Sequence, residues 1–285
     1  MLSWLYKPKK TAAKAGPKAQ GADKPTAEAP AAESSGADAP APRKRVVEIG
    51  WLIAAEKATF VYEAPRQTGR KAAMPENVKA VGFCPAVIDN EARLYEILCP
   101  VDLTLRIGKN DKGQPFLANT EGQRSTVATK TWQSMVQILP TPSWPAPNRP
   151  LIRFNAPWRF VADEPVWMLQ TPPFGHYQEK PWPGILRGTR LPIHLWPRSL
   201  TWTFEWRETG KELVLKRGEP WFYLRFEIED PSRPMRLIEA ESTPELEEYC
   251  GGLERSDSFV EDSDALLEVA AARRPSKLLK KKIRA

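Results

Sequence analysis

The clearest fold signal is the stretch Leu200-Thr201-Trp202-Thr203-Phe204-Glu205-Trp206, in which large apolar residues alternate with polar ones. A period of two places all four apolar residues on one face of a β-strand. The same alternation recurs over residues 222–228, where Tyr223, Arg225 and Glu227 take the opposite face. Both stretches therefore predict strands with one face on a core. The residues predicted to form the centre of that core are Trp202, Phe204, Phe222, Leu224 and Phe226.

Short apolar runs bounded by Pro, Gly, Asn and Asp continue through residues 46–240. The segment Arg217-Gly218-Glu219-Pro220 separates two of them and predicts a β-hairpin, because its glycine can adopt a positive φ. About ten or eleven short strands without helical patterns between them predict a mainly β fold, an antiparallel β-sandwich or jelly-roll-like domain. The other strand candidates are Val46–Ala55, Ala58–Glu63, Val78–Gly82, Arg93–Leu98, Asp102–Ile107, Thr131–Leu139, Leu151–Asn155, Pro165–Gln170, Lys211–Lys216 and Arg236–Glu239.

Composition narrows the class of protein. Of 285 residues, 29 are proline and 11 are tryptophan. Proline at about twice its average frequency argues against long helical bundles, and no run of about 18 apolar residues predicts a membrane span. Three cysteines without a CxxC pair indicate a reducing compartment, and the lack of a secretory signal indicates cytoplasmic synthesis. A single Cys84–Cys99 bridge stays open.

The composition also divides the chain into three parts, of which residues 46–240 are the β domain. Residues 1–45 contain twelve alanines, six prolines and nine Lys or Arg against four Asp or Glu, which predicts a disordered arm. The start of the arm has two interpretations. It is either a frayed terminus or a short peptide that docks into a partner or adsorbs weakly to an anionic membrane surface. The docking residues in the second interpretation are Leu2, Trp4, Leu5 and Tyr6.

Residues 241–285 change from acidic to basic and predict a charged tail with short helices at Thr243–Tyr249 and Ala265–Arg273. The basic run is either a solvated tail or a contact for phosphates or an acidic surface, and the acidic stretch before it could fold back on it. Its members are Arg273, Arg274, Lys277, Lys280, Lys281, Lys282 and Arg284. Residues 1–45 and 254–285 are predicted to be dispensable for folding.

Tryptophan beside proline recurs between residues 132 and 221, which contain nine tryptophans. One interpretation is structural, with indoles packed in extended loops that cap the sheet. The alternative is an exposed aromatic platform for a glycan, a nucleic acid or a protein. The candidates for such a platform are Trp144, Trp182 and Trp196.

No motif identifies a reaction, and no catalytic, metal or cofactor residue is predicted. The two histidines, His176 and His194, lack the His-x-Asp or His-x-Glu pairing of iron/2-oxoglutarate oxygenases. His and Cys never meet at zinc-ligand spacing, and there is no nucleophile elbow, Walker loop or Rossmann fingerprint. Cys84 and Cys99, each followed by proline, are interpreted as small buried residues at strand ends.

Three blocks resemble an uncharacterised protein family of large tailed phages. The first joins Gly82–Ala86 to Tyr95–Leu103, the second joins Ile193–Arg198 to Trp202–Glu205, and the third is Lys216–Phe226. In the second block this sequence has a leucine and a proline where the family tends to have an acid and a lysine. The resemblance covers about 50 residues and implies phage origin and a β-rich fold. The family has no assigned activity, so the resemblance implies no site residue.

These observations favour a non-enzymatic structural or interaction protein whose flexible arms serve in assembly with protein partners or with copies of itself. Such a protein would suit a phage virion. The first alternative is a Trp-rich β-sandwich that binds nucleic acid or a glycan, helped by the basic ends. The second is a jelly-roll enzyme of unrecognised class, without a predicted cofactor.

Overall fold

The computed structural model describes residues 45–54, 60–68, 84–122, 125, 127–257 and 262–283. The sequence predictions for Leu2, Trp4, Leu5, Tyr6, Arg284 and the strand Val78–Gly82 lie outside these residues. Lys44–Ala285 forms one compact unit. The described chain is mainly β with several antiparallel sheets, as the sequence predicted.

The first sheet has six strands in the order β14-β1-β7-β11-β9, with β6 also paired to β7. Strands β1 and β14 run parallel, whereas every other pair in this sheet is antiparallel. The bounds are β1 Val47–Ile53, β6 Val136–Ile138, β7 Leu151–Val161, β9 Gly184–Leu186, β11 Ser199–Trp206 and β14 Met235–Glu239.

The second sheet has the order β10-β8-β13-β3-β2, and a third, smaller sheet has the order β12-β4-β5. All their pairs are antiparallel. In the second sheet the bounds are β2 Arg66–Gln67, β3 Leu94–Leu98, β8 Val166–Thr171, β10 Thr189–Pro192 and β13 Pro220–Ile228. In the third they are β4 Leu103–Lys109, β5 Pro115–Asn119 and β12 Leu213–Leu215.

The predicted hairpin across residues 217–220 is wrong. Strand β12 pairs with β4, and β13 pairs with β3 and β8, so the two flanking strands belong to different sheets. Gly218 does adopt a positive φ of 81°, but its N–H donates to the Cys99 carbonyl, and the Cys99 N–H donates to Glu219. The turn is therefore bound to the end of β3 and carries the chain from one sheet to another.

The predicted core centre is confirmed. Trp202, Phe204, Phe222, Leu224 and Phe226 are each at most 1% exposed and belong to one apolar cluster. The first two sheets pack face to face through it: the rings of Trp202 and Phe222 lie 4.3 Å apart, and those of Phe160 and Phe226 lie 5.6 Å apart. Large aromatic rings that meet across two sheets bury much apolar area.

The faces opposite this core are less exposed than their polar residues suggest. Glu205 is fully buried, and Tyr223 is buried against Phe174, with ring centroids 5.2 Å apart. The alternation itself is correct, but loops and arginine side chains cover parts of both outer faces.

One helix replaces part of a predicted strand, and another begins beside Cys84, which was predicted to be buried. Residues 131–135 of the expected strand Thr131–Leu139 belong to helix α2, Thr129–Met135, and only residues 136–138 are a strand. Trp132 and Met135, three residues apart, share the buried face of that helix. Cys84 is exposed and precedes helix α1, Pro85–Ala92, so the prediction that it is buried is wrong. Proline at the first position suits a helix start, and Cys84, Cys99 and Cys250 form no disulfide with one another.

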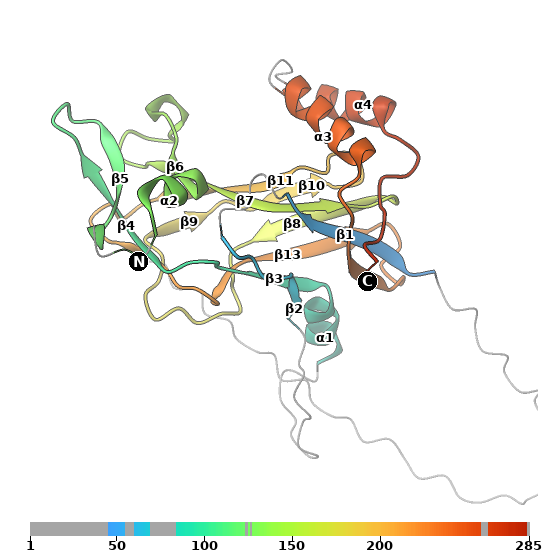
Figure 1. Ribbon diagram of the computed structural model, residues 1–285. Coiled ribbons are helices and arrows are strands. Elements are labelled where there is room, and N and C mark those ends of the chain that lie inside the picture. The colour runs from blue at the N-terminus through green and yellow to red at the C-terminus, as the bar shows by residue number, and fades with distance from the viewer. Residues whose placement is uncertain are drawn as a thin grey trace, which may run out of the picture. The chain divides into compact units, whose positions relative to one another are not determined.

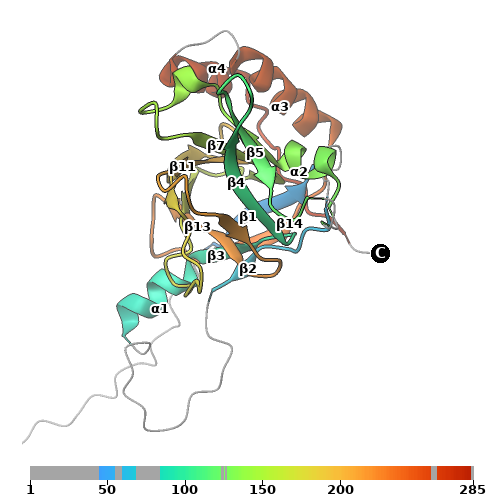
Figure 2. The ribbon, with the colours of Figure 1, turned by 90° about the vertical axis from the view of Figure 1, so that its left-hand side faces the viewer.

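The C-terminal residues pack on the first sheet instead of extending into solvent. Helices α3, Pro244–Asp257, and α4, Ser263–Arg273, form a second apolar cluster with Leu278, Leu279 and the outer side of the β1–β7 region. Arg159 of β7 binds both carboxylate oxygens of Glu247 at 2.8 Å. Figures 1 and 2 both show α3 and α4 on one side of the sheets and α1 on the other.

A charged tail therefore does not describe residues 274–283. Apolar Leu278 and Leu279 anchor the segment, and an isolated bridge joins Lys281 to Ala240. Within the described residues, no helix is both long enough and apolar enough to span a membrane.

Candidate functional site

The two histidines have local roles. Nδ1 of His194 lies 3.2 Å from the Val166 nitrogen and 3.1 Å from its carbonyl oxygen, and burial lowers the pKa of His194. Nε2 of His176 lies 3.8 Å from a Glu219 carboxylate oxygen. Among the described residues, no group of three or more His, Cys, Asp and Glu side chains could hold a metal ion. The remaining candidate sites are pockets and charged surfaces.

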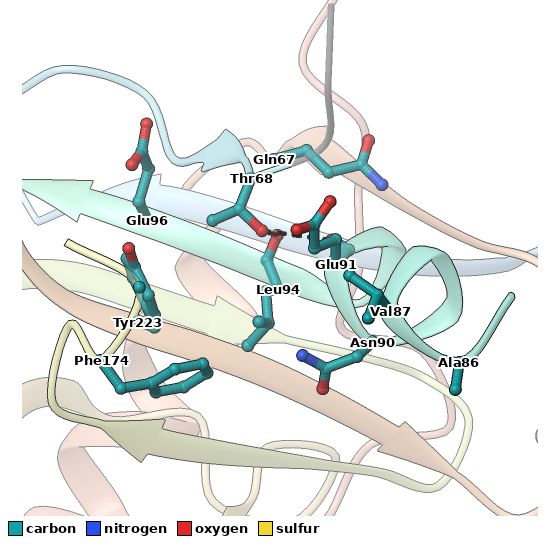
Figure 3. Close-up of a pocket in the computed structure, with 11 residues that line it drawn as sticks. Gln67, Thr68, Ala86, Val87, Asn90, Glu91, Leu94, Glu96, Phe174 and Tyr223 are labelled. Carbon is teal, nitrogen blue, oxygen red and sulfur yellow. Dashed lines mark hydrogen bonds between the residues drawn. The ribbon is translucent and has the colours of Figure 1, made fainter. Parts of the chain in front are cut away.

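A pocket of about 620 Å³ lies on the outer face of the second sheet, beneath α1. Figure 3 shows Tyr223 and Phe174 on one side of it and Asn90 and Val87 of α1 on the other. The Thr68 hydroxyl fixes one edge, because it lies 3.2 Å from the Glu91 carbonyl oxygen and 3.3 Å from that of Leu94.

Among the described residues, the side chains that line this pocket include two carboxylates but no lysine, arginine or histidine. Glu96 is paired with Arg66 at 2.7 Å, and Arg225 donates to the Asn90 side chain at 3.0 Å from behind the lining. Burial, followed by the nearby Glu96 charge, raises the pKa of Tyr223, so its phenol stays protonated at neutral pH. Carboxylates and a phenol suit an uncharged polar ligand and disfavour a phosphate.

The most unusual charge cluster lies on the outer face of the first sheet. The carboxylate of Glu205 has no exposed surface, and three arginines bind it. Arg207 reaches it at 3.1 Å and Arg149 at 3.6 Å, while Arg187 donates a hydrogen bond to its other oxygen. The three arginine side chains remain 45%, 45% and 54% exposed in that order. One carboxylate cannot neutralise three guanidinium groups, so this arginine cluster carries two excess positive charges.

The strand arrangement explains why the arginines converge. Strand β9 pairs with β11 so closely that a Cβ on Gly184 would lie 2.1 Å from the Glu205 carbonyl oxygen. Glycine is therefore required there, and Arg187 directly follows this short edge strand. On the other side of β11, the backbone N–H of Trp206 donates to the Pro150 carbonyl at 2.9 Å, which places Arg149 beside the end of this strand. Arg207 is the next residue after β11.

A second pocket, of about 520 Å³, adjoins the arginine cluster. Its lining includes Asn148 and Pro150, on either side of Arg149, and Thr209, two residues after Arg207. We call it the Trp144 pocket, because it is also lined by Trp144 and by the cationic Lys109 and Lys112. The complete lining is Ile107, Gly108, Lys109, Lys112, Gly113, Gln114, Pro115, Thr141, Trp144, Pro147, Asn148, Pro150 and Thr209.

Local hydrogen bonds hold both the aromatic wall and the cationic wall of the Trp144 pocket in place. The Trp144 indole N–H donates to the Leu139 carbonyl at 2.8 Å, which fixes the ring in its proline-rich loop. The turn between β4 and β5 is closed by Asn110, whose side-chain oxygen accepts from the backbone N–H groups of Lys112 and Gln114. Gly113 supplies the positive φ, 73°, that this turn requires.

The structure does not gather the three tryptophans predicted as a platform. Trp182 is half-buried and packs edge-on against Phe204 at 6.1 Å in the main core. Trp196 is half-buried against the C-terminal cluster, with Arg198 4.7 Å above its ring. No ring contact among the described residues joins any two of the three, and only Trp144 lines a basic pocket.

Much of the predicted basic run takes part in internal contacts. Arg274 donates to Asp163 and to the backbone carbonyls of His194 and Ala162. Lys280 pairs with Glu241 at 3.0 Å, and Lys282 pairs with Glu239 at 2.7 Å. Arg273, Lys277 and Lys281 are exposed. Of the acidic stretch that precedes this run, Glu241 contributes one exposed ion pair to it.

Sequence reasoning missed Arg149, Arg187, Arg207, Lys109 and Lys112, because they are scattered over four segments and converge only in the fold. The available signal was Glu205, an acid between the large aromatic residues of a strand, whose burial would demand cationic partners. No protein-family model, no curated protein and no solved structure matches the chain.

Proposed function

We propose that this protein is a non-enzymatic binding protein that attaches to nucleic acid through the arginine cluster and the adjoining Trp144 pocket. The observation that carries the proposal is the convergence of three half-exposed arginines on one buried carboxylate. Because Glu205 holds the guanidinium groups in place, little side-chain freedom is lost when a phosphate binds. Arginine also suits phosphate better than other cations do, since its planar group can bind two oxygens at once.

The charge of the surroundings supports a polyanion. Lys109 and Lys112 extend the positive surface of the arginine cluster into the Trp144 pocket. Glu208, the acidic residue beside Arg207, is already paired with Lys211. The pocket beneath α1, with its two carboxylates, is the less suitable place for phosphate. A nucleic acid offers the repeated phosphates that such a surface attracts.

The test is fluorescence anisotropy of a labelled oligonucleotide with the full chain, at salt concentrations from about 50 to 200 mM. We expect the logarithm of the binding constant to fall linearly with the logarithm of salt concentration. Arg187→Gln should weaken binding and reduce that slope by roughly one, as expected for the loss of one phosphate contact. Glu205 keeps two arginine partners in this variant, so the fold should survive.

Arg190→Gln is the matched control. Arg190 is as exposed as Arg187, at 54%, and is also paired with a glutamate, Glu227, but lies on edge strand β10 of the second sheet. We expect it to leave affinity and slope unchanged. Equal losses in both variants would indicate general attraction to a basic protein, and the absence of binding at low salt would refute the proposal.

We also propose, from the sequence, a role in assembly, with a virion as one setting. A jelly-roll topology is a further proposal from the sequence. They are supported by the sandwich-like packing of two sheets and by the composition of residues 1–45. Sedimentation velocity of the full chain, compared with a variant lacking residues 1–43, tests the assembly role. A concentration-dependent oligomer of the full chain that disappears on deletion would support the assembly role. If the full chain and the deletion variant are both monomeric, the result would count against it.

A further inference from the structure

We infer that the Trp144 pocket receives an unpaired base, so that the nucleic acid bound by this protein is single-stranded. This inference rests on the proposed function, since the arginine cluster would hold the phosphates of the same strand. The two features meet at Arg149, which contacts Glu205 and lies between two residues of the pocket lining, Asn148 and Pro150.

The size and lining of the pocket suit a base. A volume of about 520 Å³ lies within the range of small-ligand sites. One wall carries the indole of Trp144, and proline rings at 115, 147 and 150 supply further flat apolar surface. Every base has a π-face that can stack on an aromatic ring, so this recognition tolerates any sequence.

Polar groups in the lining complement the edges of a base and its phosphate. Asn148, Gln114 and Thr141 offer amide and hydroxyl groups that donate and accept hydrogen bonds. Lys109 and Lys112 offer cations for the adjacent backbone. In the lining as described, no side chain is acidic, in contrast to the pocket beneath α1, which has Glu91 and Glu96.

Duplex nucleic acid fits this arrangement less well, because its bases are paired and stacked and show only their edges in the grooves. A base reaches a lateral pocket only when it is unpaired or is extruded at a cost in free energy. The combination of a basic surface with an aromatic stacking site is the one used by proteins that bind single strands without sequence preference.

The experiment compares three labelled probes at one salt concentration: an oligothymidine of about 15 nucleotides, the same length with abasic sites throughout, and a duplex. The abasic strand keeps the phosphates and loses the stacking groups. We expect the full chain to bind the oligothymidine about 5- to 150-fold more tightly than the abasic strand. Trp144→Leu, which keeps apolar bulk without an aromatic face, should remove most of this difference while leaving affinity for the abasic strand unchanged.

Trp196→Leu is the control, because Trp196 is also half-buried and followed by proline but packs on the other apolar cluster. It should keep the full preference for the oligothymidine. If Trp144→Leu does not fold, Lys109→Ala with intact Trp144 should weaken all single strands and preserve the preference. Equal affinity of the unaltered chain for all three probes would overturn this inference and leave the proposed function standing. Failure to bind any of them would overturn both.

Discussion

Glu205 has a structural role in the arginine cluster, whereas the arginines are the groups that would bind the ligand. Its buried carboxylate orients Arg149, Arg187 and Arg207, yet its negative charge opposes a bound phosphate. Buried ion pairs of this kind contribute little net stability unless both partners are well hydrogen-bonded. Their value here is that three flexible side chains are directed to one place.

Replacing Glu205 with glutamine should therefore have opposite effects on folding and on binding. We expect Glu205→Gln to lower the free energy of unfolding by about 1–3 kcal/mol, because charged hydrogen bonds are lost. Nucleic-acid affinity should stay equal or rise, because one negative charge is removed while the glutamine oxygen can still accept a hydrogen bond that orients an arginine. Urea denaturation and anisotropy measure the two effects. A folded variant that no longer binds would mean that the loss of arginine orientation by the carboxylate outweighs the removal of its negative charge.

Tyr249 provides a test of the C-terminal packing through its pKa. Its phenol oxygen lies 2.6 Å from the Leu195 carbonyl oxygen and 2.9 Å from that of Ala270. Burial raises its pKa from 10.0 to about 12. Above pH 10 the unfolded chain releases the phenol proton while the folded chain keeps it, so the folded state loses stability as pH rises towards 12.

We expect the difference in unfolding free energy between the unaltered chain and Tyr249→Phe to be constant below pH 10 and to shrink between pH 10 and 12. Taking the difference cancels Cys99, whose pKa burial also raises to about 12. Denaturation curves at roughly pH 8, 9, 10 and 11 measure this difference in unfolding free energy. A difference that is independent of pH over this range would show that the phenol is not held between the two carbonyls.

At the scale of elements, the two main sheets are joined by aromatic side chains. Phe226 of β13 contacts Tyr95 of β3 at 5.7 Å and Phe160 of β7 at 5.6 Å. Phe226→Ala should lower the free energy of unfolding by about 3–5 kcal/mol through loss of burial and a residual cavity. Thr203→Ala, on the outer face of β11, should cost less than half as much. Equal losses in thermal or urea denaturation would contradict the assignment of inner and outer faces.

The C-terminal segment is an element of the fold, although its sequence is that of a charged tail. A Cβ on Gly50 of β1 would lie 2.3 Å from the Leu279 side chain, so Leu279 packs directly on that strand. We expect Leu279→Ala to cost about 2–5 kcal/mol. Lys280→Ala, which removes only an exposed pair with Glu241, should cost about 0–1 kcal/mol. Losses of equal size would mean that the segment is not anchored.

Prediction from sequence succeeded where the signal was local. Alternation of residues specifies a strand and its buried face, so β11, β13 and their shared core were predictable. It does not specify partners, which is why a turn at Gly218 was assigned to a hairpin although its strands join separate sheets. Helix α2 was missed because seven residues show too little of a helical period, although Trp132 and Met135 have the three-residue spacing of one helix face.

The candidate site was less predictable, because its residues share no local pattern. The three arginines stand beside proline, glycine or a strand end. An arginine at such a position does not by itself indicate a binding site. Trp144 was one of three tryptophans that the sequence offered as platform candidates, and Trp182 and Trp196 looked equivalent to it. What distinguishes Trp144 is its place beside Lys109, Lys112 and the arginine cluster, which depends on long-range strand pairing.

In the whole molecule, the proposed nucleic-acid site lies at the end formed by β4, β5, β9 and the loop before β7. Helices α3 and α4 lie away from this end (Figure 1). The most direct measurement is ultraviolet crosslinking of a single-stranded oligonucleotide to the full chain, followed by mass spectrometry of the attached peptides. We expect crosslinks within residues 107–115 and 141–150, with Trp144 as the principal site. Crosslinks confined to residues 273–283, or to the pocket beneath α1, would contradict the account.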